Sequence, residues 1–122
     1  MSRTIMIVDD SISMRQIIAI ALKGAGYSVI ESFNGKDALS KLTDERIHLF
    51  ISDLNMPGMD GFGFVRALKE KPAYKFAPVL MLTTETQEHK KQEGKAAGVR
   101  AWMSKPFQVE QLLAAVEKLA LA

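Results

Sequence analysis

The sequence alternates between short apolar runs and stretches suited to helices, and this alternation restricts the fold more than any other feature. Runs expected to form strands cover residues 5–8, 27–33, 48–52, 79–82 and 101–104. Stretches expected to form helices follow each run, around residues 14–21, 38–42, 62–68, 85–97 and 109–116. Five strands alternating with five helices predict a parallel sheet covered on both faces, which is a three-layer α/β/α sandwich.

The ends of the first helix carry their own signals. Ser13 is the expected N-cap, because a serine hydroxyl can accept a hydrogen bond from a free N–H of the first helical turn. The Gly-Ala-Gly sequence at residues 24–26 is expected to end the helix. Within it, Met14, Ile17 and Ile18 recur at helical spacing and form the predicted apolar stripe.

Length and composition exclude several classes of protein. The 122 residues suit one domain, and we expect residues 1–122 to form it. The absence of cysteine excludes a disulfide scaffold, a cysteine-ligated zinc site and thiol catalysis. A net charge of +2 with no basic block argues against nucleic-acid binding. The longest apolar run, Ile17–Leu22, is too short to cross a membrane, and residues 1–4 do not resemble a signal peptide, so we expect a cytoplasmic protein.

Polar side chains follow the predicted strands at the points where those strands end. They are Asp9 and Asp10 after the first strand, Asp53 after the third, Thr83 after the fourth and Lys105 after the fifth. In an open parallel sheet, ligands bind in the crevice beyond the carboxyl ends of the strands. The sequence therefore predicts a polar site at one edge of the sheet.

Three carboxylates at one edge need a cation. Two of them about 4 Å apart repel each other by roughly 4 kcal/mol at an effective dielectric constant near 20. Oxygen ligands of this kind suit Mg²⁺, which takes one or two carboxylates and often a phosphate. One Mg²⁺ and Lys105 together balance Asp9, Asp10 and Asp53, which leaves the site ready for a further anion.

A phosphoryl group is the anion that this set of residues suits best. Phosphoryl transfer depends on charge neutralisation and positioning, and a carboxylate can accept the group. Asp53 is the best-placed nucleophile, because it stands between an apolar strand and a turn. Lys105 could neutralise one phosphoryl oxygen, and the Thr83 hydroxyl could donate a hydrogen bond to another.

Taken together, these motifs resemble a known family. The matching segments, in order along the chain, are Val-Asp-Asp-Ser at 8–11, Ser-Asp-Leu-Asn-Met-Pro-Gly-Met-Asp-Gly at 52–61, Leu-Thr-Thr at 82–84 and Ser-Lys-Pro-Phe at 104–107. Their order and spacing resemble the receiver domains of two-component response regulators, of the stand-alone chemotaxis (CheY-like) type. The resemblance spans essentially the whole chain and implies a flavodoxin-like sheet of strand order 2-1-3-4-5.

The resemblance also implies a role for each matching residue. Asp53 matches the aspartate that takes a phosphoryl group from a histidine kinase. Asp10 and Asp53 match direct Mg²⁺ ligands, with Asp9 acting mainly through water and Asn55 through its backbone carbonyl. Thr83 and Lys105 match the residues that contact the phosphoryl oxygens.

In the same family, phosphorylation changes a surface that a partner recognises. The resemblance implies that Thr83 moves toward the phosphoryl group and that Trp102, on the fifth strand, turns inward behind it; an alternative is a tryptophan that simply packs on the sheet. Residues 87–95 contain no large apolar side chain, which favours a mobile fourth helix. Gln87-Glu88 stands where motor-binding members carry a basic pair, and Lys90-Lys91 follows later. Both a flagellar motor switch and another effector therefore stay open as partners of a monomeric protein.

Two other functions stay open beside an activated signalling protein. The first is a phosphate sink or phosphorelay carrier without a target of its own, which nothing in the sequence distinguishes from the leading interpretation. The second is an aspartate-nucleophile phosphatase, which we disfavour because those enzymes carry an acid two residues after the nucleophile, where this chain has Asn55. We therefore expect no turnover of external substrates, only phosphorylation and dephosphorylation of the chain itself. An acidic edge also argues against a flavin, because it would repel the cofactor's phosphate.

Overall fold

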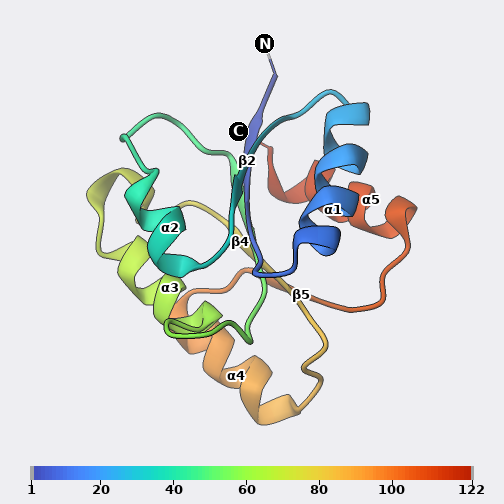
Figure 1. The fold of residues 1–122 in the computed structure, drawn as a ribbon. Helices are drawn as coiled ribbons and strands as arrows, with labels where there is room; N and C mark the ends of the chain where they lie inside the picture. Colours follow the sequence, from blue (N-terminus) through green and yellow to red (C-terminus); the bar gives the residue numbers. More distant parts are fainter. Residues whose placement is uncertain (1, 122) are drawn as a thin grey trace.

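The computed structural model describes residues 2–121 and shows three layers, with helices on both faces of a central sheet (Figure 1). The strands are β1 (Thr4–Val8), β2 (Ser28–Ser32), β3 (Leu49–Ser52), β4 (Val79–Thr83) and β5 (Ala101–Ser104). The helices are α1 (Ile12–Gly24), α2 (Gly35–Ser40), α3 (Gly61–Lys69), α4 (Glu88–Ala97) and α5 (Val109–Leu119), with a short 3₁₀ helix, η1 (Pro72–Tyr74).

The sheet has the order β2-β1-β3-β4-β5, and every pair of neighbouring strands is parallel. The predicted three-layer sandwich and its strand order are therefore confirmed. Val8 of β1 pairs in register with Ser52 of β3, so the next residues, Asp9 and Asp53, leave neighbouring strands side by side. This register brings the acidic side chains together.

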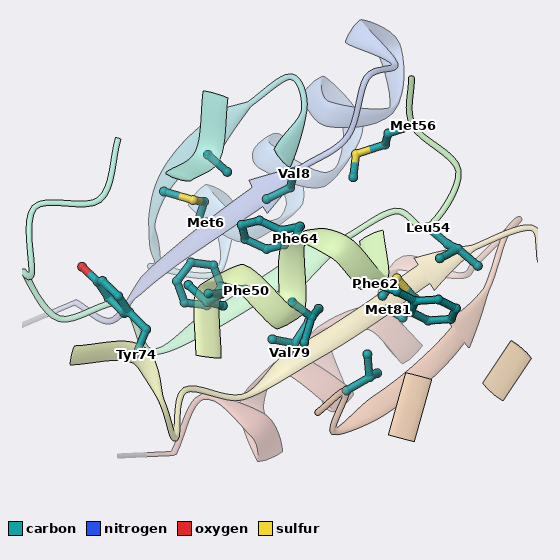
Figure 2. Close-up of a cluster of buried hydrophobic side chains, with 14 of the residues drawn as sticks. Met6, Val8, Phe50, Leu54, Met56, Phe62, Phe64, Tyr74, Val79 and Met81 are labelled. Carbon is teal, nitrogen blue, oxygen red and sulfur yellow. The ribbon is translucent and has the colours of Figure 1, made fainter. Parts of the chain in front are cut away.

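The strands are apolar throughout because each face of the sheet is covered by helices. One core lies under α2 and α3 and includes Met6, Phe50 and Phe64, which Figure 2 shows packed with Tyr74. The ring centroids of Phe50 and Phe64 are 6.0 Å apart, and those of Phe50 and Tyr74 are 5.8 Å apart. The other core lies under α1 and α5 and takes the alternate strand residues, such as Ile5, Ile7 and Leu49.

The start of the first helix differs from the prediction. Ser11, not Ser13, is the N-cap: its backbone is extended and its hydroxyl accepts a hydrogen bond from the Met14 N–H at 3.2 Å. The helix begins at Ile12, so Ser13 lies already inside its first turn. The apolar stripe is also shifted, because Ile18 and Leu22 are buried whereas Ile17 is half exposed.

The fourth helix is shorter than predicted. It begins at Glu88, whereas the sequence suggested residue 85. Glu85 stays in the preceding loop, where its carboxylate accepts a hydrogen bond from the Gln87 N–H at 3.0 Å. Among residues 2–121, no helix combines the length and apolar character needed to cross a bilayer.

Candidate functional site

An acidic pocket lies at the carboxyl ends of β1 and β3. Asp9 and Asp10 follow β1, Asp53 follows β3, and one carboxylate oxygen of each lies within 4.8 Å of the others. Asp9 is buried, Asp53 is partly buried and Asp10 is exposed. We use the name acidic pocket for these three residues and Lys105, because the structure brings all four together as predicted.

Backbone hydrogen bonds orient two of the carboxylates. Asp53 is tied to β1 by its N–H, which donates to the Val8 carbonyl at 2.9 Å, and its Oδ1 accepts from the Leu54 N–H at 2.7 Å. The Oδ1 of Asp9 accepts from the Ser11 N–H at 2.9 Å. One oxygen of each carboxylate is thereby held by the backbone, which directs the other oxygen into the pocket.

Lys105 lies between these two carboxylates. Its Nζ is 2.8 Å from Asp9 Oδ2 and 3.2 Å from Asp53 Oδ2. The side chain of Lys105 is 10% exposed, that of Asp9 3% and that of Asp53 13%, so solvent screens the attraction between their charges only little. Burial opposes the charge on Lys105, but the hydrogen bond and charge of Asp9, followed by those of Asp53, outweigh it and raise the pKa of Lys105. The lysine therefore stays charged beside its partners.

The pocket still carries an excess of negative charge. Three carboxylates and one ammonium group give a formal charge of −2, from three negative groups and one positive group. A divalent cation would neutralise this charge, and the carboxylate oxygens are near enough for small side-chain movements to place them on one ion. An all-oxygen set suits a hard cation such as Mg²⁺ better than a softer metal.

The other predicted site residues lie around this pocket without joining the cluster. Thr83 ends β4 and is buried, and its Oγ1 accepts from the Glu85 N–H at 3.4 Å. Its carbonyl accepts from the Lys105 N–H at 2.9 Å, which ties the end of β4 to the lysine. Asn55 lies exposed in the loop after β3.

Trp102 of β5 is half-buried and is hydrogen-bonded to the loop that follows Thr83. Its indole Nε1 donates to the Glu85 carbonyl at 3.0 Å. Its ring packs against Phe62, with the centroids 6.2 Å apart, and against Gly94 of α4. The structure thus links the end of β4, the loop after it, β5 and α4 through one side chain.

Sequence reasoning missed two parts of this arrangement. Gly94 has a packing role, because a Cβ there would lie 3.0 Å from Trp102 Cζ3 and 3.1 Å from Phe62 Cε1. A glycine inside a helix is a weak signal for close packing, but its contacts cannot be read from the chain. Arg15 was also missed: its Nη1 donates to the Asp9 carbonyl at 2.6 Å, and its Nε lies 3.5 Å from Glu31 Oε1.

Comparison with known proteins assigns the chain to a family. Residues 5–117 match the family model of the response regulator receiver domain. The chain is 34% identical to Protein PilG of Pseudomonas aeruginosa, over 93% of this chain and 84% of PilG. It is 36% identical to Chemotaxis protein CheY of the same species, over 94% of each chain. The structure is also similar to the solved structure of the chemotaxis protein CheY4 of Vibrio cholerae, with a TM-score of 0.94 and 47% sequence identity, over 98% of this chain and 99% of CheY4.

These matches cover nearly all of the chain and include the loops that carry the acidic pocket. The sheet order agrees with this assignment, and the matched residues 5–117 contain Asp9, Asp10, Asp53 and Lys105. The protein therefore belongs to the response regulator receiver domains of two-component systems, and it is similar to the chemotaxis members of that family.

Proposed function

We propose that the protein is a phosphorylation-activated response regulator of a chemotaxis-type two-component system. In this role it accepts a phosphoryl group from a histidine kinase on Asp53, with Mg²⁺ as the metal. The supporting observation is the acidic pocket itself, in which a partly buried carboxylate lies 3.2 Å from an ammonium group and within 4.8 Å of two further carboxylates.

Each residue has a distinct chemical task in this proposal. A carboxylate oxygen of Asp53 attacks phosphorus, the bond from phosphorus to the donor's imidazole nitrogen breaks, and the departing imidazole takes up a proton. Mg²⁺ supplies charge neutralisation to the phosphoryl oxygens when it is bound by Asp10 and Asp53, with Asp9 acting through water and Asn55 through its carbonyl. Lys105 neutralises another phosphoryl oxygen, and the Thr83 hydroxyl donates to it or to a neighbouring one.

The proposed output runs through Thr83 and Trp102. The Thr83 hydroxyl accepts from the N–H of Glu85, and the carbonyl of Glu85 accepts from Trp102, so a movement of Thr83 displaces the partner of the indole. Gly94 is the one fully buried residue described within α4, so little packing holds this helix in place. We propose that phosphorylation changes the surface of α4, β5 and α5 and that an effector, such as a flagellar motor switch, recognises the change.

A direct experiment tests phosphorylation and its readout together. The purified chain is incubated with a small-molecule phosphodonor with and without Mg²⁺, and intact mass and Trp102 fluorescence are followed. We expect one added phosphoryl group that requires Mg²⁺ and Asp53, accompanied by a change in fluorescence. An Asp53→Asn variant is the matched control. Failure of the chain to gain a phosphoryl group would refute the proposed acceptor, and phosphorylation with unchanged fluorescence would refute the coupling to Trp102.

A further inference from the structure

A hollow of about 630 Å³ lies at the amino-terminal edge of the sheet, opposite the acidic pocket. Its walls come from the segments that lead into β3, β4 and β5, from η1 and from the end of α5. We call it the amino-edge hollow, and its lining includes Asp44, Arg46, His48, Phe76, Arg100 and Leu121. Its volume lies within the range of about 300–1,000 Å³ that is usual for small-molecule sites.

Basic groups dominate the charged part of this hollow. Arg46, His48 and Arg100 line it, and Asp44 is the one acidic side chain among the described lining residues. Within residues 2–121, Arg100 forms no ion pair. His48 Nδ1 accepts a hydrogen bond from the Thr4 N–H at 3.0 Å, so the neutral ring carries its proton on Nε2 as a further donor.

The pKa values of neighbouring groups reflect charges of both signs at this edge, since burial raises the pKa of Tyr74 and the negative charges of Asp44 and Glu45 raise it further. Burial lowers the pKa of His48, and the positive charges of Arg46 and Arg3 lower it further. Burial likewise lowers the pKa of Lys69, and the next contribution is the charge of Arg100. The charges of Arg46 and Arg100 thus disfavour further positive charge on His48 and Lys69, and an anion bound in the hollow would reduce that effect.

The same hollow has an apolar wall with an exposed aromatic ring. Phe76 is 83% exposed, so one face of its ring is accessible to a ligand, and Lys75 Nζ lies 5.6 Å from its ring centroid. Leu121, also on the wall, is 67% exposed. A planar ring on Phe76 and an anionic group on the arginines would use both parts of the hollow at once.

We propose that the amino-edge hollow binds a nucleotide, with its phosphate held by Arg46 and Arg100 and its base stacked on Phe76. Guanidinium groups bind phosphate through paired, charge-assisted hydrogen bonds, and aromatic rings bind bases of any sequence by stacking. The Asp44 carboxylate can accept hydrogen bonds from the amino edge of a base. The site is separate from the acidic pocket, since one lies where the strands begin and the other where they end.

Arg100 gives this site a route to the rest of the molecule. It also lines a second hollow, on the surface of α4 and β5, together with Trp102, Lys91 and Lys95. A phosphate bound to Arg100 therefore reduces the positive charge beside the surface that we propose for effector binding.

Calorimetric titration of the 122-residue chain tests the proposal. GMP and AMP are titrated separately, and guanosine, adenosine and inorganic phosphate serve as the base-only and phosphate-only probes. We expect saturable binding of at least one nucleotide to one site, with weaker binding of the matching nucleoside and of phosphate. Arg100→Ala should weaken nucleotide binding by about tenfold to a hundredfold, and Phe76→Ala by about fivefold to a hundredfold.

Matched variants separate this site from general surface effects. Arg66→Ala removes an exposed arginine of α3, and Phe33→Ala removes another exposed phenylalanine, both outside the hollow. These variants should bind nucleotide like the wild type. Absence of saturable binding by both nucleotides, or equal losses in the site and control variants, would overturn the proposal. Equal affinity for inorganic phosphate and nucleotide would also overturn it, because the base would then contribute nothing.

Discussion

Replacing Gly94 by alanine is expected to destabilise the protein, although alanine is the better helix former. Gly94 is buried in α4 beneath the rings of Trp102 and Phe62. An added Cβ would lie 3.0 Å from Trp102 Cζ3 and 3.1 Å from Phe62 Cε1, which is closer than ordinary van der Waals contact. Both rings must give way by a few tenths of an ångström, and Trp102 is also held in place by the hydrogen bond from its Nε1 to the Glu85 carbonyl.

The size of the effect follows from two opposing contributions. Alanine gains about 1 kcal/mol of helix propensity over glycine, whereas overpacking a filled site costs about 1–3 kcal/mol. We therefore expect Gly94→Ala to lower the free energy of unfolding by up to about 2 kcal/mol. In a Trp102→Ala background one ring is gone and Phe62 has room to shift, so the same substitution should be neutral or stabilising.

A double-mutant cycle measures this coupling. Urea unfolding of the wild type, both single variants and the double variant is followed by far-ultraviolet circular dichroism, because Trp102→Ala removes the only tryptophan. We expect a coupling energy of about 1–2 kcal/mol between positions 94 and 102. Gly24→Ala is the matched control, since a Cβ at the end of α1 would meet no atom within 4 Å. A coupling below about 0.5 kcal/mol, or a Gly94→Ala protein more stable than the wild type, would refute this account of the glycine.

Four further predictions follow from the same structure. Asp10→Asn should stabilise the protein in EDTA by about 1–2 kcal/mol, because the exposed Asp10 carboxylate repels those of Asp9 and Asp53 through a partly aqueous medium. Urea titrations should also show that Mg²⁺ stabilises this variant less than the wild type; lower stability of the variant in EDTA would contradict the prediction. Lys105→Met should cost about 3–5 kcal/mol in EDTA by leaving a buried carboxylate without its partner, and Mg²⁺ should restore part of the loss; an equal loss with and without Mg²⁺ would count against it. Because the pKa of His48 is lowered in the folded protein, the unfolded chain takes up a proton at this residue first as pH falls through about 6.5. The urea midpoint of the wild type should therefore decrease from pH 7.5 to 5.5 more than that of His48→Gln. Parallel curves of urea midpoint against pH for the two proteins would contradict this. Thr84→Ala, which shortens an exposed side chain next to Thr83, should raise the rate of phosphorylation by small phosphodonors in a stopped-flow fluorescence assay, and an unchanged rate would rule out Thr84 as an obstacle.

Much of the site could be predicted because it depends on strand ends. Once five apolar runs are read as parallel strands, Asp9, Asp53 and Lys105 must meet at one edge of the sheet, whatever the packing of the helices. The apolar character of each strand on both faces likewise predicted two helical layers. The N-cap of α1 was predicted two residues too late. Ser11 and Ser13 are both acceptable caps, and only the path of the chain after β1 selects Ser11.

Other features exist only because distant segments pack together. Gly94 is needed because α4 packs closely against Trp102 of β5 and Phe62 of α3, and no local sequence pattern predicts this close packing. The amino-edge hollow is assembled from segments before three strands and from the end of α5, so its basic and apolar walls are scattered along the sequence. Periodicity and turn signals act over a few residues, and they therefore determined the elements, their order and the edge that carries the acids. Distances, exposure and close contacts between side chains arise from packing over the whole molecule, and these were decided by the tertiary structure alone.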